Sequence, residues 1–313
     1  MINNECLEFM FDNGVGVRNE NKLHGTGELE RFNVDGDKPN SLNGWMVYRD
    51  GLVQSCTFGT WKEGIVYNWF SVDVNTLKKK EMDEMRKAAT EAKVAAYKEK
   101  ALMEKEQKAI ASGTCAKIWH ESGTHGIKAH PYIVNKEIQP YGIKIESISM
   151  ALLIPVMSCE GIKSIQRIFP SGRKMFHKNG TISGGYFLVE DDEKECTKTI
   201  YITEGYATAC SIYEMTKTPV YVCFNAGNIY AVASQIINMN PGYEVVICAD
   251  NDHSNKENTG ELKAVDAGNK TGAKVLFIGD TRYGTDWNDV VYNAGFENAS
   301  AMFSKSFDEM RGK

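Results

Sequence analysis

Apolar and polar positions alternate in a regular way from residue 199 to residue 278. Short apolar runs rich in β-branched residues occur at 199–203, 220–224, 244–249 and 273–278. Amphipathic stretches of helical composition separate them, at 206–215, 229–239 and 260–271. Strands that alternate with helices in this manner form parallel sheets covered by helices on both faces. The pattern therefore predicts an α/β fold, with a Rossmann-like parallel sheet in a C-terminal domain at 195–313.

The first part of the chain has a different pattern. Residues 1–75 are rich in glycine, asparagine and aromatic side chains, with short extended-looking segments between turn signals, so we expect a small β-rich N-terminal domain. Residues 76–112 contain neither glycine nor proline and predict one long, charged helical linker. The apolar seam of this helix is interrupted at Glu99, which favours a solvated spacer over a coiled coil.

Residues 113–194 predict a mixed α+β subdomain. Two apolar runs, 151–156 and 163–169, have the composition of strands and are separated by the turn signal Glu160-Gly161. A charged bridge then leads into the C-terminal domain. The chain as a whole is thus expected to contain three folded parts and one helical linker.

Composition and charge exclude several classes of protein. Of the 313 residues, 42% are hydrophobic and 25% are charged, which are values typical of globular chains. The net charge of −5 means that any nucleic-acid contact must come from a local basic patch. The eight cysteines include no Cys-x-x-Cys pair, so we expect reduced thiols and no zinc. No leader peptide and no stretch of about 18 apolar residues is evident, so a cytoplasmic protein without a membrane partner is expected.

Carboxylates follow three of the apolar runs in the C-terminal domain. Glu204 follows the run at 199–203, Asp250 and Asp252 follow the run at 244–249, and Asp286 and Asp289 come after the last run and its loop. The carboxyl ends of parallel strands meet at one edge of a sheet, so these side chains should lie close together. Clustered oxygen ligands with few histidines favour Mg²⁺ or Mn²⁺. The arrangement therefore predicts a divalent-metal phosphoryl-transfer site.

The order Glu-Gly after one strand and Asp-x-Asp after a later one resembles the Toprim domain of topoisomerases, primases and some nucleases. The hexapeptide Glu204-Gly205-Tyr206-Ala207-Thr208-Ala209 is the EGYATA motif of primases encoded by satellite phages and conjugative plasmids. Other segments, including Tyr141-Gly142-Ile143 and Asn43-Gly44-Trp45, also resemble these proteins, so the similarity covers most of the chain. The cysteine-based zinc module and the P-loop helicase of many primases have no counterpart in these residues.

The resemblance implies a role for each carboxylate. Glu204 would act as the acid/base or metal-organising group, and Asp250 and Asp252 would hold Mg²⁺ against the phosphates of an incoming nucleoside triphosphate. Asp286 and Asp289 would either complete this metal-binding rim or cap the helix that begins near Trp287. The implied activity is synthesis of short primers on single-stranded DNA during phage or plasmid replication in a bacterial cytoplasm, with a separate replicative helicase.

Basic residues precede the C-terminal domain and are interleaved with Phe169, Phe176 and His177. Cations with aromatic residues between them suit single-stranded nucleic acid, whose phosphates pair with the cations while its bases stack. We therefore predict a single-stranded-DNA contact on one face of this strand pair, made by Lys163, Arg167, Arg173, Lys174 and Lys178. Two alternatives stay open for the whole chain: a metal-dependent nuclease of the Toprim type, and a non-catalytic single-stranded-DNA-binding replication accessory.

Overall fold

The computed structural model describes residues 2–18, 23–51, 53–73, 77–195, 197–251, 259–279 and 281–312. The chain divides into two compact units, Met1–Glu106 and Gln107–Lys313. Among the described residues, no helix combines the length and the apolar character needed to cross a membrane.

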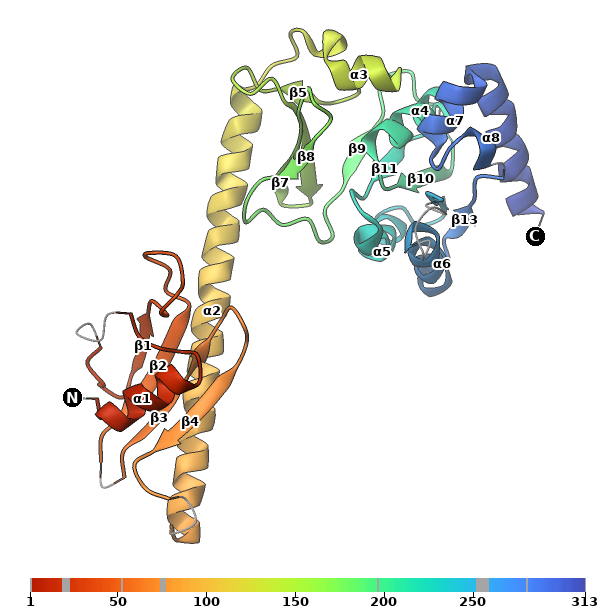
Figure 1. The fold of residues 1–313 in the computed structure, drawn as a ribbon. Coiled ribbons are helices and arrows are strands. Elements are labelled where there is room, and N and C mark those ends of the chain that lie inside the picture. The colour runs from red at the N-terminus through yellow and green to blue at the C-terminus, as the bar shows by residue number, and fades with distance from the viewer. Residues whose placement is uncertain are drawn as a thin grey trace. The chain divides into compact units, whose positions relative to one another are not determined.

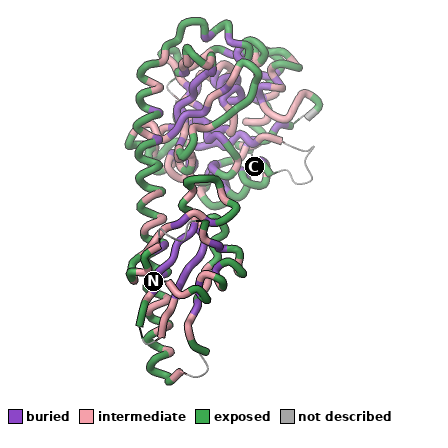
Figure 2. Tube along the Cα trace, turned by 60° about the vertical axis from the view of Figure 1, so that its left-hand side comes forward, coloured by how far each residue is buried: buried purple, intermediate pink, exposed green. Residues whose placement is uncertain are grey.

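The first unit contains a four-stranded antiparallel sheet in the order β1-β2-β3-β4. Its elements are α1 (Asn4–Asp12), β1 (Leu29–Phe32), β2 (Gly44–Arg49), β3 (Ser55–Thr60) and β4 (Val66–Phe70). Helix α1 contributes Met10 to a core that also contains Tyr48 and Phe58 of the sheet. Figure 2 shows buried residues within this sheet, and the two central strands β2 and β3 are buried at most positions. Trp45 and Trp69 are buried too, so these aromatic side chains pack in the core of the unit.

Helix α2 (Lys79–Glu121) is longer than the sequence predicts. The expected linker ends at residue 112, whereas the helix continues through Gly113 for nine residues more. A glycine inside a helix costs about 1 kcal/mol relative to alanine. That cost is offset because Cys115 is buried against Leu153 and Ile165, with Ile118 and Trp119 beside it. Tertiary packing therefore extends the helix beyond the limit that its composition suggests.

The second unit begins with a four-stranded antiparallel sheet in the order β5-β6-β7-β8. Its elements are α2 up to Glu121, η3 (Ile127–Ala129), α3 (Pro131–Lys136), β5 (Lys144–Ile145), β6 (Leu152–Ser158), β7 (Gly161–Ile168) and β8 (Lys174–Phe176). The predicted strand pair is present as β6 and β7, and the two residues between them are Cys159 and Glu160. One face of this sheet packs on α2, and the other contributes Ile154 and Ile168 to the main core.

A five-stranded sheet follows, in the order β13-β12-β10-β11-β9 (Figure 1). Its strands are β9 (Phe187–Val189), β10 (Thr199–Thr203), β11 (Val220–Val222), β12 (Glu244–Cys248) and β13 (Lys274–Leu276). Four strands are parallel, as the alternating pattern predicts, and only β9 runs antiparallel. The predicted mixed α/β fold with a Rossmann-like parallel sheet is therefore confirmed.

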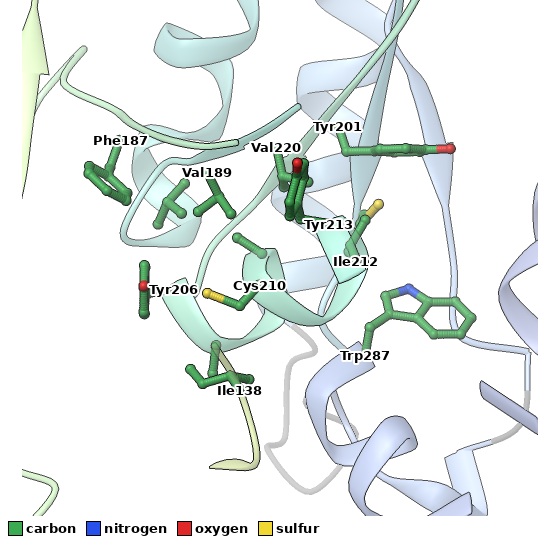
Figure 3. Packing of buried hydrophobic residues seen from close by; sticks show 14 of the residues in the cluster. Ile138, Phe187, Val189, Tyr201, Tyr206, Cys210, Ile212, Tyr213, Val220 and Trp287 are labelled. Carbon is green, nitrogen blue, oxygen red and sulfur yellow. The ribbon is translucent and has the colours of Figure 1, made fainter. Parts of the chain in front are cut away.

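Helices cover both faces of this sheet (Figure 1). They are α4 (Tyr206–Thr216), η4 (Ala226–Asn228), α5 (Ile229–Met239), α6 (Thr259–Thr271), η5 (Thr281–Tyr283), α7 (Trp287–Ala294) and α8 (Phe296–Arg311). Successive strand residues point to opposite faces. Thus Ile200 and Ile202 pack with α5 and α6, whereas Tyr201 between them packs with α4, α7 and α8. Figure 3 shows part of the cluster that contains Tyr201, with Ile212 of α4 and Trp287 of α7.

Candidate active site

Glu204 lies at the carboxyl end of the central strand. Strand β10 is buried from Ile200 to Thr203, and α4 begins immediately after the N-cap residue Gly205. Glu204 stands between the two elements and is partly exposed. Because it follows the last residue of a parallel strand and is partly exposed, its carboxylate lies at the edge of the sheet where the parallel strands end.

Gly260 brings the neighbouring strand end against Glu204. A Cβ atom placed on Gly260, in the first turn of α6, would lie 3.0 Å from Glu204 Oε1 and 3.0 Å from the carbonyl oxygen of Asp250. Such a distance is shorter than ordinary carbon–oxygen van der Waals contact. The helix, the Glu204 carboxylate and the end of β12 therefore meet at a point where only a glycine fits without a shift.

Asp250 follows β12 and is partly exposed. The next residue, Asn251, donates its backbone N–H to the carbonyl oxygen of Thr285 at 2.7 Å, which ties this strand end to the loop before α7. Burial is the main cause of the raised pKa of the Cys223 thiol, and the charges of Glu204 and Asp250 both raise it further. Two carboxylates that act on one thiol from separate strands share the same edge of the sheet. Asp252 lies outside the described residues.

Asp286 and Asp289 have distinct structural partners. Asp286 is the N-cap of α7, and its Oδ1 accepts the backbone N–H of Asp289 at 2.9 Å. Burial raises the pKa of Asp286, although its backbone hydrogen bonds partly offset this. Asp289 forms an ion pair with Lys136, with 3.2 Å between Oδ1 and Nζ. Asp286 can therefore cap α7 and still belong to the carboxylate rim, whereas Asp289 is oriented towards Lys136.

A pocket of about 460 Å³ opens beside these carboxylates. It lies between α3, the turn from β7 to β8, and α7. The residues that line it are Tyr132, Asn135, Lys136, Pro170, Ser171, Gly172, Lys174, Asn288, Asp289 and Tyr292. Two lysines and one aspartate give the lining a net charge of +1 if all three are ionised. The pocket therefore suits an anionic ligand.

Lys174 connects this pocket with the carboxylates. Burial of its ammonium group, and then the nearby charge of Lys136, lower the pKa of Lys174, whereas Asp286 and Asp250 act in the opposite direction. The side chain reaches the surface at the start of β8, and its Nζ lies 5.5 Å from the centre of the Tyr132 ring. Lys174 is thus a cation placed within electrostatic reach of two of the predicted site carboxylates.

Lys136 was not identified by the sequence pattern. It is the last residue of the short helix α3, and its partner Asp289 is 153 positions away in the chain. Asn288 reinforces the junction, because its Nδ2 donates to the carbonyl oxygen of Lys136 at 2.8 Å. No local signal in the sequence marks a lysine that acquires its role only through such a distant contact.

The other predicted basic residues do not share one face of the strand pair. Arg167 pairs with Leu153, whose face packs on α2, whereas Lys174 pairs with Ile168, whose face belongs to the main core. Lys163 lies where the β6–β7 register shifts, so it has no residue directly opposite it on β6. The expectation of five cations on one face is therefore wrong in this respect.

Ion pairs and ring contacts hold several of these cations. Arg167 forms an ion pair with Glu146 at 3.1 Å, and both side chains are largely buried. Lys163 pairs with Glu160. The guanidinium carbon of Arg173 lies 4.7 Å from the centre of the Phe169 ring, and Lys178 is exposed. Of the five, Arg173, Lys174 and Lys178 remain the residues best placed to meet a strand of nucleic acid.

Residues 199–297 match the Toprim domain family. These residues form a Toprim domain. The chain is also similar to two curated proteins named DNA primase TraC, both from Escherichia coli. One is 26% identical over 259 residues, which cover 80% of this chain and 24% of the relative. The other is 30% identical over 154 residues, which cover 47% of this chain and 11% of the relative. The chain thus spans less than a quarter of the length of these relatives.

Solved structures that match this chain include two primases. One is the Aquifex aeolicus primase with its zinc-binding and RNA polymerase domains, at a TM-score of 0.44 and 12% identity, covering 91% of this chain and 80% of that one. The other is a DNA primase domain from Pseudomonas aeruginosa, at a TM-score of 0.42 and 11% identity, covering 63% of this chain and 78% of that one.

Within the Toprim domain, the EGYATA segment has a clear division of roles. Glu204 reaches the edge of the sheet, whereas the residues from Tyr206 onward are buried in the first two turns of α4. The Tyr206 hydroxyl donates to the carbonyl oxygen of Tyr141 at 3.0 Å. Tyr206 therefore packs against the segment before the Toprim domain and is not available to stack on a base.

Toprim domains bind divalent metals, and the donor atoms of this site fit such an ion. Among the described residues, no three histidine, cysteine, aspartate or glutamate side chains are grouped closely enough to form a complete protein cage. Mg²⁺ does not require one, because it is usually held by one or two carboxylates together with water and substrate phosphates. The Glu204 carboxylate, which meets the backbone of Asp250 at Gly260, and the Asp250 carboxylate are hard oxygen donors of this kind.

Proposed function

We propose that this chain makes short primers on single-stranded DNA by joining nucleoside triphosphates in a reaction that depends on Mg²⁺ or Mn²⁺. One observation carries the proposal: Asp250, whose backbone meets the Glu204 carboxylate at Gly260, lies within electrostatic reach of Lys174 in a pocket that contains a second lysine. Similarity to proteins named DNA primase supports the same reaction class.

The pocket supplies the groups that a triphosphate requires. Lys136 and Lys174 would bind phosphate oxygens, and the ion pair with Asp289 orients Lys136 at the pocket wall. Asp286, at the start of α7, lies within electrostatic reach of Lys174, and its charge would favour the ionised form of that ammonium group. The nucleotide would then lie with its phosphates towards Asp250.

Glu204 and Asp250 would hold the divalent ion. The bound ion would stabilise the negative charge that develops on the attacking oxygen and on the leaving pyrophosphate. Glu204 Oε1 would accept the proton of the attacking hydroxyl. It can lie close to the first turn of α6 because Gly260 has no side chain. Arg173 and Lys178 would bind the phosphates of the template strand beside this site.

Replacing either strand-end carboxylate tests the proposal. We expect Glu204→Gln and Asp250→Asn each to lower primer synthesis by about 100-fold or more, because each removes a charge that holds the ion or accepts a proton. The measurement is incorporation of labelled nucleotides on single-stranded DNA with Mg²⁺. Circular dichroism would establish that both variants are folded.

Asp266→Asn is the matched control. Asp266 is an exposed carboxylate on α6 that forms an ion pair with Lys270, so its loss should leave synthesis unchanged. Full synthesis by Glu204→Gln or by Asp250→Asn would reject the assignment of the site. Shortening of the DNA in place of primer formation would replace the proposal with a nuclease.

A further inference from the structure

Tyr292 lines the pocket but has no structural partner in the described part of the chain. It is 58% exposed on α7. Within the described ranges, its hydroxyl forms no hydrogen bond and its ring contacts no aromatic or cationic group. By contrast, Tyr132 on the other side of the pocket is buried. An exposed aromatic ring at the rim of an anion-binding pocket is therefore free to meet a ligand.

The position of Tyr292 on α7 fixes which part of a ligand it can reach. Asp289 and Tyr292 are three residues apart, so they lie on the same face of the helix, one turn apart. Asp289 is bound to Lys136 at 3.2 Å. The Cβ atoms of residues so placed are about 5 to 6 Å apart, so the tyrosine side chain leaves the helix beside the carboxylate that pairs with Lys136. In a nucleotide the base is joined to the phosphates through the sugar, so a base at Tyr292 is compatible with phosphates at Lys136.

We propose that Tyr292 is the stacking platform for the base of the nucleoside triphosphate whose phosphates bind Lys136 and Lys174. The inference rests on the proposed function and names a base subsite within it. A pocket of about 460 Å³ has the size of a single small-molecule ligand. Stacking on an aromatic ring tolerates every base, because each base has a π-face. A chain that copies a template needs such tolerance at this position.

A ligand with phosphates but no base separates stacking from charge. Equilibrium binding of ATP and of inorganic triphosphate would be measured with the full chain in the presence of Mg²⁺. We expect Tyr292→Ala to weaken ATP binding by about tenfold and to leave inorganic triphosphate binding unchanged. Tyr292→Phe keeps the ring and should bind ATP as the natural chain does. Lys136→Ala should weaken both ligands.

Tyr243→Ala is the matched control, because Tyr243 is 44% exposed and lies directly before β12, at the opposite end of that strand from Asp250. The inference fails if Tyr292→Ala binds ATP normally, if it weakens both ligands equally, or if the natural chain binds no ATP. One further result would reject the proposed function and leave the base subsite standing. If ATP binds with the expected dependence on Tyr292 but no primer is made, the base subsite stands and primer synthesis is rejected.

Discussion

Gly260 contributes to the site because it has no side chain. The first turn of α6 can approach Glu204 and the end of β12 because no Cβ atom intervenes. A Cβ atom here would crowd two groups: the flexible Glu204 side chain, which can move aside, and the backbone oxygen of Asp250, which moves with difficulty because it belongs to a strand end. The position of the Glu204 carboxylate therefore depends on a residue that has no reactive side chain.

Gly260→Ala should separate activity from stability. Alanine favours a helix by up to about 1 kcal/mol over glycine, and the close contact with the backbone oxygen of Asp250 opposes this gain, so we expect the melting temperature to change little. The displaced Glu204 carboxylate should lower primer synthesis by about tenfold or more. Thermal unfolding and nucleotide incorporation, measured on the same preparation, test both parts.

Gly113→Ala provides the comparison for this change. Gly113 is inside α2, and a Cβ atom there would have no heavy atom within 4 Å. This variant should gain stability and keep full synthesis. If Gly260→Ala behaved in the same way, close packing at Gly260 would have no bearing on the orientation of Glu204.

At the level of elements, α3 depends on an unusual cap. His130 precedes the helix, and its Nδ1 accepts the backbone N–H of Tyr132 at 3.1 Å, while its Nε2 lies 3.1 Å from the carbonyl oxygen of Met150. A ring that accepts at Nδ1 and donates at Nε2 must be neutral. Burial is the main cause of the lowered pKa of His130, and the hydrogen bond to Met150 partly opposes it.

The capped helix should therefore lose stability in acid. The pKa of His130 is lower in the folded chain than the value of about 6.5 expected when unfolded, so its contribution is complete above that pH and is lost as the pH falls through the folded value. We expect His130→Asn to unfold with less dependence on pH below about 6.5, because asparagine caps helices without titrating there. Denaturant unfolding at several pH values measures this.

His120→Asn is a suitable control, because His120 is an exposed residue of α2. It should follow the natural chain at every pH. An unaltered pH dependence in His130→Asn would assign the acid sensitivity to other groups.

The sequence predicts helices and strands well where the apolar residues follow one regular pattern. The strands and helices of the Toprim domain are readable because the apolar runs of β10, β11 and β12 are buried on both faces, and the strand-end positions of Glu204 and Asp250 follow from them. The end of α2 is not readable, because it is set by contact with Leu153 and Ile165. The partners of Arg167 and Lys136 are hidden for the same reason: their contacts come from distant segments.

At the level of the whole molecule, the two units have separate hydrophobic cores. The core around Tyr48 belongs to the first unit, and the clusters that contain Ile165, Ile202 and Trp287 belong to the second. A domain with its own core can fold alone. The second unit begins at Gln107, within α2, so the last part of this helix is part of its fold.

We therefore expect residues 107–313 to fold in one cooperative transition and to bind ATP as the full chain does. A chain that begins at Ser122 is the comparison, because it lacks Cys115, Ile118 and Trp119, which cover one face of the β6–β7 pair. Loss of this cover should cost about 3 kcal/mol or more. Calorimetry of the two chains tests the division. If both unfold alike, α2 adds nothing to the second unit.

The antiparallel strand β9 also determines where the C-terminal sheet can be separated from its neighbours. The residues that match the Toprim family begin at 199, yet Phe187–Val189 already hydrogen-bond to β11. A gene fusion that joined the chain at residue 199 would lack β9. Strand β11 would then be an open edge whose unpaired backbone groups could bind a strand of another chain. Recombination between genes should therefore transfer this sheet together with the segment from Phe187, or into a recipient that already provides a strand for the same edge.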